Sequence, residues 1–165
     1  MAGAHKSASL ASEPLEDARV LVVEARYYDD LADELLKGAL GVLEASSVTA
    51  TVVTVPGSLE IPSTVAIMLE AASAHGKPFD AVVTLGTVIR GETYHFEIVA
   101  GESARALMDL SVAYGMPLGN GILTVENDDQ AWARARISEG NKGGGAAEAA
   151  ITVLRIKNRA IAGEI

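Results

Sequence analysis

Hydrophobic residues along this chain follow two spacings, and each change of spacing marks the start of a new predicted element. Short runs of apolar and β-branched residues predict four buried strands, at 19–25, 49–55, 79–88 and 120–126. Longer stretches with apolar residues at helical spacing predict five helices, at 29–46, 62–76, 95–115, 128–140 and 144–163. Strands that alternate with helices are typical of a parallel sheet with helices on both faces.

We therefore predict an α/β fold, namely a three-layer α/β/α sandwich around a four-stranded parallel sheet of the flavodoxin-like kind. Residues 1–17 are small and polar, so we expect a flexible N-terminal arm there. A length of 165 residues suits one hydrophobic core, which places a single domain at 18–165.

The last predicted helix carries two apolar stripes, one more than a helix needs to cover one face of a sheet. We expect the second stripe to be covered either by a neighbouring subunit or by the first helices of the same chain. That stripe consists of Ala149, Val153, Ile156 and Ala160.

Composition and charge narrow the functional classes. The chain has no cysteine, which excludes disulfides and thiolate metal sites. A net charge of −9 and scattered basic residues argue against nucleic acids and anionic membranes as partners. No apolar run reaches the length of a membrane span, and residues 1–17 lack the apolar core of a signal peptide, so we expect a cytoplasmic protein. A few local cations would have to receive any anionic ligand.

In an open parallel sheet, ligands bind beyond the carboxyl ends of the strands. Residues with unusual chemistry gather at these ends. They are Arg26, Tyr27 and Tyr28 after the first strand, Ser58 and Glu60 after the second, and the stretch TLGTVIRGETYHFEIV (84–99) around the end of the third.

The junction after the third strand is the densest of these groups. His95 falls in the first turn of the predicted helix, where the positive end of the helix dipole favours a neutral imidazole that can accept a proton. Gly91, Glu92 and Thr93 place backbone N–H groups and a hydroxyl at the same helix start, which outlines an anion site. Arg90 would either add positive charge to this site or form a structural ion pair. The alternative for Thr93 is a plain helix cap.

The glycine-rich stretch GNKGGGAAEAA (140–150) invites comparison with a phosphate loop. It lacks the spacing and the Lys-Ser/Thr ending of a Walker loop. We interpret it as a joint between two helices.

Together these segments resemble the lumazine synthase (6,7-dimethyl-8-ribityllumazine synthase) family. The similarity rests on five pieces in order: VVEARYYDDLADELLKGAL, TVPGSLEIP, TLGTVIRGETYHFEIV, GNGILTVENDDQAWARA and GNKGGGAAEAA. They cover nearly all of residues 20–150, and the second and third pieces are very specific in combination.

The resemblance implies a transferase that condenses 5-amino-6-(D-ribitylamino)uracil with 3,4-dihydroxy-2-butanone 4-phosphate. The products would be 6,7-dimethyl-8-ribityllumazine, phosphate and water, in the penultimate step of riboflavin biosynthesis. The resemblance also implies that no metal or organic cofactor is needed. It further implies a homopentamer with its active sites between neighbouring subunits.

The resemblance assigns roles to single residues. Tyr27 matches the aromatic platform for the pyrimidine. Glu92 and Thr93 match the phosphate cradle, Arg134 matches an arginine that grips the phosphate from the adjacent chain, and His95 matches the histidine that moves protons. Contacts to the ribityl chain and ring fall on Ser58, Leu59, Glu60, Thr87, Val88 and Ile89.

Two positions depart from the family pattern. Many members have phenylalanine where this chain has Leu59, and an aromatic residue where it has Asn120. Stacking on the substrates should therefore be weaker, and Asn120 would hydrogen-bond them instead. The departures leave a second reading open, a non-catalytic paralogue that binds a lumazine or flavin, while His95 and Arg134 favour an enzyme.

Overall fold

Four parallel strands form the central sheet, in the order β2-β1-β3-β4. The computed structural model describes residues 14–165. The strands are β1 (Arg19–Ala25), β2 (Thr49–Val55), β3 (Ala81–Ile89) and β4 (Leu118–Val125). This order is that of a flavodoxin-like sheet, as predicted.

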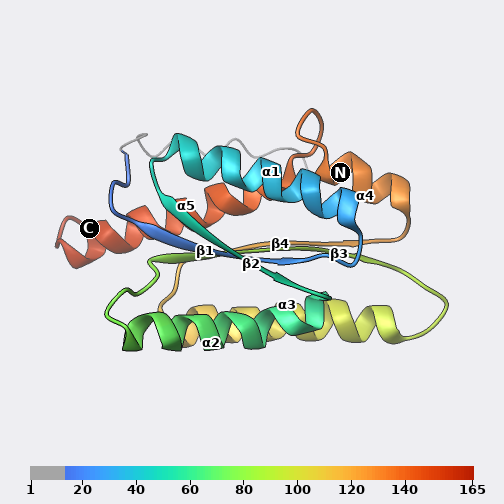
Figure 1. Cartoon of the computed structure of the whole chain (residues 1–165), viewed down its shortest axis with the longest axis horizontal. Coiled ribbons are helices and arrows are strands. Elements are labelled where there is room, and N and C mark those ends of the chain that lie inside the picture. The colour runs from blue at the N-terminus through green and yellow to red at the C-terminus, as the bar shows by residue number, and fades with distance from the viewer. Residues whose placement is uncertain (1–13) are drawn as a thin grey trace.

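Helices cover both faces of the sheet and complete the predicted three layers. They are α1 (Asp29–Ala45), α2 (Ile61–Ala74), α3 (His95–Tyr114), α4 (Asp128–Ala135) and α5 (Lys142–Ile161), with a short 3₁₀ turn η1 (Ser58–Glu60) before α2. Figure 1 shows α1, α4 and α5 on one face and α2 and α3 on the other. Each face encloses its own cluster of buried apolar side chains.

The burial of each strand follows from its place in the sheet. The two central strands, β1 and β3, are buried along almost their whole length, as expected for strands with a covering helix on each face. The edge strand β2 is partly buried or exposed up to its last residue, Val55, which is buried. The central strands therefore supply the rigid frame from which the loops at the carboxyl edge project.

The predicted end of the fourth helix was wrong. The helix predicted at 128–140 ends at Ala135, because the backbone of Arg136 is extended and the chain then turns back on itself. The N–H group of Gly140 donates to the carbonyl of Ala133 at 2.9 Å. A Cβ atom at Gly140 would lie 2.8 Å from that carbonyl oxygen, so only glycine fits this return of the chain without a shift. The apolar pattern that continues to Ile137 belongs to this turn.

Most of the glycine-rich stretch belongs to α5, which begins at Lys142 rather than at the predicted residue 144. Asn141 caps the helix, since its side-chain oxygen accepts the N–H group of Gly144 at 3.1 Å. A Cβ atom on Gly143 would lie 2.0 Å from the carbonyl oxygen of Leu35 in α1. A Cβ atom on Gly119 in β4 would lie 1.8 Å from the carbonyl oxygen of Ala146. The small residues thus let α5 lie directly on α1 and β4.

The second apolar stripe of α5 is exposed along the described part of the chain. Val153 and Ile156 are 45% and 44% exposed, and Ala149 and Ala160 are also exposed. The alternative that the first helices of the same chain cover this stripe is therefore wrong. Among residues 14–165, no helix is long and apolar enough to cross a membrane.

The end of the predicted N-terminal arm contacts the domain. The N–H group of Leu15 donates to the carbonyl of Ser46 at 3.0 Å, and its side chain packs against the core next to α1. Residues 1–13, the rest of that predicted arm, lie outside the described residues.

Candidate active site

A pocket of about 560 Å³ lies at the carboxyl edge of the sheet. Residues that follow β1, β2 and β3 line it, which places it where the connections leave β1 and β3 toward opposite faces. Such a switch point is where open α/β sheets bind ligands. Nine of the residues predicted for the site line this pocket: Tyr27, Ser58, Leu59, Glu60, Thr87, Val88, Ile89, Thr93 and His95.

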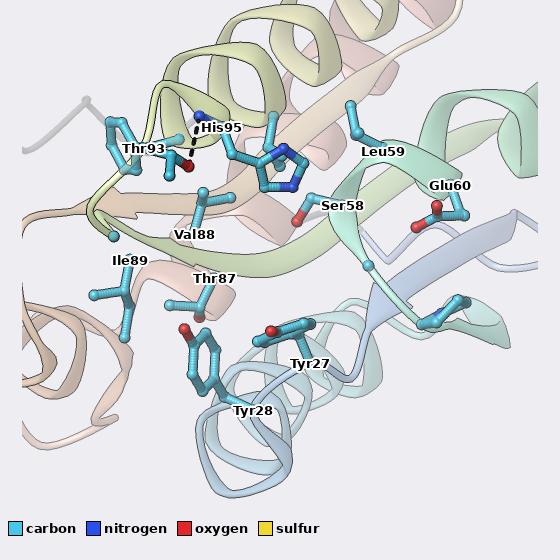
Figure 2. Close-up of a pocket in the computed structure, with 15 residues that line it drawn as sticks. Tyr27, Tyr28, Ser58, Leu59, Glu60, Thr87, Val88, Ile89, Thr93 and His95 are labelled. Carbon is cyan, nitrogen blue, oxygen red and sulfur yellow. Dashed lines mark hydrogen bonds between the residues drawn. The ribbon is translucent and has the colours of Figure 1, made fainter.

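Two tyrosines after β1 form one side of the pocket (Figure 2). Tyr27 is 74% exposed, so its ring offers a free surface on which a flat ligand could stack. The ring of Tyr28 meets that of Tyr27 edge-on, with the ring centroids 5.0 Å apart. Burial raises the pKa of the Tyr28 phenol, so the hydroxyl stays protonated and can donate a hydrogen bond at neutral pH.

The turn after β2 forms a second side. Ser58 is buried, and a Cβ atom on Gly86 of β3 would come within 2.8 Å of its hydroxyl oxygen. Gly86 therefore makes room for Ser58. Glu60 is exposed at the start of α2, where its backbone carbonyl accepts the hydroxyl of Thr64 at 2.8 Å. The Glu60 carboxylate stays available to accept hydrogen bonds from a ligand with hydroxyl groups.

The end of β3 forms the floor, because this strand continues beyond the end of β1. Glu24 of β1 pairs with Leu85, so the residues from Thr87 to Ile89 extend past the last residue of β1. Thr87 is 8% exposed, and its hydroxyl has no hydrogen-bond partner among the described residues. A buried hydroxyl without a partner is costly unless a ligand or a water molecule satisfies it.

The start of α3 closes the pocket opposite the tyrosines, as Figure 2 shows. His95 is the first residue of the helix, is exposed and lines the pocket. The hydroxyl of Thr93 accepts the N–H group of His95 at 3.4 Å, a long contact, and the N-cap residue Tyr94 makes no side-chain cap. Backbone N–H groups at this helix start are therefore weakly engaged and can face an anion.

Within residues 14–165, the pocket has no lysine or arginine to receive an anion. Arg26 donates to Glu24 at 2.9 Å and to Asp33 at 2.7 Å, and these bonds raise its pKa. Among residues 14–165, no group of three or more histidine, aspartate or glutamate side chains is placed to hold a metal ion.

Arg90 forms ion pairs with two carboxylates, as the structural alternative proposed. It donates to Glu126 at 2.7 Å and to Glu97, and its guanidinium lies 4.2 Å from the centre of the Phe96 ring. The bonds to Glu126 and Glu97 raise the pKa of Arg90, and Arg90 lowers the pKa of the Glu97 carboxyl.

Three predicted site residues do not line this pocket. Glu92 is exposed beside it, in the loop before α3. Asn120 lies on the edge strand β4, and its side-chain oxygen accepts the N–H group of Ile122 at 3.0 Å. Arg134 is exposed on α4 and donates to the carbonyl of Gln130 at 3.0 Å. Their predicted roles would need a second chain or a shift of the loop.

From the sequence, no role was assigned to several residues that line the pocket. The main ones are Tyr28, Phe96 and Val99. The sequence placed Tyr28 at the end of the first strand, next to the predicted platform at Tyr27, but assigned it no role. Phe96 and Val99 follow His95 near the start of α3, where helical spacing brings positions 95, 96 and 99 toward one side.

Comparison with known proteins identifies the family. The profile of the 6,7-dimethyl-8-ribityllumazine synthase family matches residues 17–158. A protein named 6,7-dimethyl-8-ribityllumazine synthase from Azorhizobium caulinodans is 62% identical over 161 residues, which cover 98% of this chain and 99% of the relative. Proteins of the same name from Xanthobacter autotrophicus and Methylobacterium nodulans are 68% and 71% identical, over 88% and 87% of this chain and 88% and 79% of theirs. The chain belongs to the 6,7-dimethyl-8-ribityllumazine synthase family.

Proposed function

We propose that this protein is a transferase that condenses 5-amino-6-(D-ribitylamino)uracil with 3,4-dihydroxy-2-butanone 4-phosphate to form 6,7-dimethyl-8-ribityllumazine. Phosphate and water are released. The observation that carries the proposal is the convergence of Tyr27, the Ser58–Glu60 turn, the end of β3 and His95 on one pocket at the switch point of the sheet. A cytoplasmic location stays a prediction from the sequence.

The pocket suits the two substrates in its different parts. The pyrimidine stacks on the exposed ring of Tyr27, and the ribityl hydroxyls reach the carboxylate of Glu60. The phosphate approaches the weakly engaged N–H groups at the start of α3, near Thr93. This arrangement brings the amine of one substrate close to the carbonyl of the other, which supplies part of the rate enhancement by proximity.

His95 moves the protons in this scheme. The amine attacks the carbonyl, water leaves as the Schiff base forms, phosphate is eliminated, and the ring closes with loss of a second water. Each step transfers a proton, and His95 lines the pocket at the helix start that faces the phosphate. None of these steps needs a covalent bond to the enzyme.

The active site is completed by a second subunit in this proposal. The described pocket contains no lysine or arginine, although one of its substrates carries a phosphate. Arg134 is exposed on α4, outside the pocket of its own chain, and is free to enter that of a neighbour. The exposed stripe of α5 gives such a neighbour an apolar surface to cover. We take a homopentamer as the assembly, as the family resemblance implies.

A product assay tests the proposed function. The purified protein is mixed with both substrates, and the absorbance and fluorescence of the lumazine are followed against the uncatalysed background. Acceleration is the expected result. Tight binding of a lumazine or riboflavin without acceleration would instead indicate a non-catalytic paralogue and direct attention to Leu59 and Asn120.

His95→Ala should lower kcat by roughly a hundredfold, because a positioned acid–base group contributes about 10²–10⁴-fold. Turnover should not disappear, since the pocket still positions both substrates. Steady-state kinetics with each substrate varied in turn measure the effect. His75→Ala, which removes a histidine at the end of α2, is the control and should keep the wild-type rate. An unchanged rate in His95→Ala would remove this residue from the mechanism.

Arg134→Ala should raise the apparent KM for the butanone phosphate by about tenfold or more, since loss of a charge-assisted contact costs roughly 1.5–3 kcal/mol. The KM for the ribitylaminouracil should change little. Arg136→Ala is the matched control, because Arg136 follows the same helix but pairs with Glu139 at 3.3 Å and stacks on Trp132. Equal KM values in wild type and Arg134→Ala would contradict the phosphate role.

A further inference from the structure

The first turn of α3 needs a support that its own sequence does not supply. It carries His95, yet its N-cap residue Tyr94 makes no side-chain hydrogen bond. The N–H group of Glu97 donates to the carbonyl of Tyr94 at 3.1 Å, but the N–H group of Ile98 reaches that carbonyl only at 3.4 Å. The N–H group of His95 likewise reaches the hydroxyl of Thr93 only at 3.4 Å. A helix start with so few short hydrogen bonds frays readily.

Arg90 supplies contacts to this turn from the end of β3. Its backbone N–H group donates to the carbonyl of Val125, the last residue of β4, at 2.9 Å. Its guanidinium donates to Glu126 on that side and to Glu97 in the first turn of α3. It also lies 4.2 Å from the ring centre of Phe96, which neighbours His95 and lines the pocket.

Glu126, one of the two residues that Arg90 joins, is itself held in place through its backbone. The backbone N–H group of Glu126 donates to the side chain of Gln130 in α4 at 2.9 Å. Asn127 in turn caps α4 by accepting the N–H group of Gln130 at 2.9 Å. One guanidinium therefore connects the start of α3 to the end of β4 and the start of α4.

We propose that Arg90 is a positioning residue, which fixes the first turn of α3 and thereby the imidazole of His95 in the pocket. It acts through Phe96 and Glu97 and does not itself line the pocket. This inference rests on the proposed function, because it assigns a purpose to the placement of His95.

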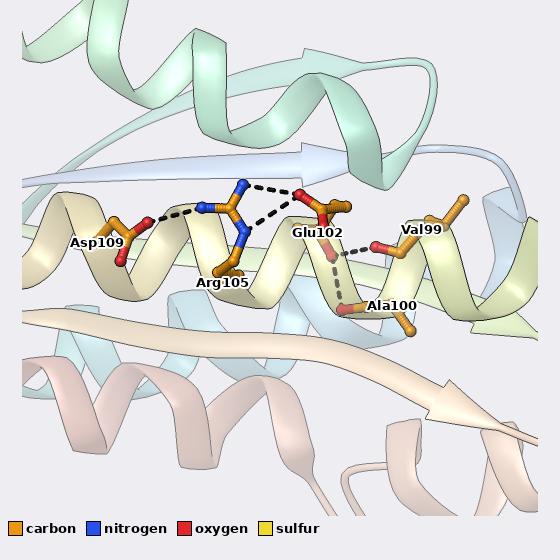
Figure 3. Close-up of polar contacts among 6 residues, drawn as sticks. Val99, Ala100, Glu102, Arg105 and Asp109 are labelled. Carbon is orange, nitrogen blue, oxygen red and sulfur yellow. Dashed lines mark hydrogen bonds and ion pairs between the residues drawn. The ribbon is translucent and has the colours of Figure 1, made fainter.

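The same helix offers a matched control. Arg105 of α3 donates to Glu102 at 2.7 Å and to Asp109 at 2.9 Å, so it also joins two carboxylates (Figure 3). All three residues lie on the exposed surface of one helix, and none lines the pocket. Exposed ion pairs of this kind contribute little to stability. Loss of Arg90 and loss of Arg105 should therefore change the melting temperature by similarly small amounts.

The two losses should differ in catalysis. Arg90→Met keeps most of the side-chain length and removes the planar charged group. It should lower kcat by about tenfold or more, because a 1 Å displacement of a catalytic geometry costs roughly a hundredfold. Arg105→Met should keep the wild-type kcat. Arg90→Lys should recover only part of the rate, since an ammonium group cannot stack on Phe96 while joining two carboxylates in a fork.

A double-mutant cycle separates positioning from a general structural effect. If Arg90 acts through His95, the double variant Arg90→Met/His95→Ala should have the same kcat as His95→Ala alone. If the two losses multiply, Arg90 acts by another route and the proposal is overturned. A wild-type kcat in Arg90→Met would overturn it equally.

A second readout does not depend on turnover. The ring resonances of His95, identified by their loss in His95→Ala, should shift in Arg90→Met and stay in place in Arg105→Met. Those of His75, at the end of α2, serve as the internal reference. If the wild-type protein made no lumazine, the proposed function would fail, and these resonances would still decide the role of Arg90. Unmoved His95 resonances in Arg90→Met would overturn that role.

Discussion

Replacing Gly143 by alanine should lower the free energy of unfolding by about 3 kcal/mol, at the upper end of what overpacking a well-packed site costs. The new Cβ atom would lie 2.0 Å from the carbonyl oxygen of Leu35 and within 3 Å of its carbonyl carbon and Cα atom. These atoms belong to the backbone of α1, so no side-chain rotation relieves the contact. The helices α1 and α5 must move apart, and buried apolar contacts between them are lost.

Gly145→Ala is the matched control for this prediction. Gly145 lies two residues further along α5, and nothing lies within 4 Å of the position where its Cβ atom would be. Alanine there should stabilise the helix, by up to about 1 kcal/mol, because glycine is a poor helix former. Thermal and urea unfolding of both variants at one fixed protein concentration compares them, since subunit association would also shift the midpoint. Equal midpoints would mean that α1 and α5 separate without cost.

The sequence was sufficient to predict the three layers and which segments form strands and helices. The reason is that the central strands β1 and β3 are continuous apolar runs and the helices have a periodic apolar pattern. The sequence was not sufficient for the close approach of α5. The stretch 140–150 was interpreted as a joint, since nothing in a local sequence shows which backbone a glycine faces. Leu35 lies more than a hundred residues from Gly143 along the chain, and only the fold brings them together.

The candidate site shows the same limit at a smaller scale. Strand ends predicted that Tyr27, Ser58 and His95 would meet at one edge, and one pocket includes all three. The positions of the strand ends did not show which carboxylates would form ion pairs with Arg90. Glu97 is seven residues away, and Glu126 follows a different strand, so the choice between a site cation and an ion pair depended on the register of β3 with β4.

Mixed oligomers of His95→Ala and Arg134→Ala subunits should have more activity than oligomers of either variant alone. The physical reason is the missing cation. The described pocket contains no lysine or arginine, and Arg134 lies outside the pocket of its own chain. In a closed ring, each subunit presents one surface to its neighbour and receives the opposite surface of the next. A subunit that keeps His95 and receives an intact Arg134 from its neighbour therefore has a complete site.

Comparison with a second kind of mixed oligomer, or hybrid, makes this prediction quantitative. The first mixture contains the two single variants, and the second contains wild type and the double variant His95→Ala/Arg134→Ala. If neighbours share each site, roughly a quarter of all sites are complete in both mixtures after equal mixing. For sites within one chain, the first mixture has no complete site and the second has roughly half. Hybrids are formed by co-expression with two affinity tags, purified through both, and assayed at low butanone phosphate. Equal rates support a shared site, whereas a rate in the second hybrid alone would place Arg134 in the active site of its own chain.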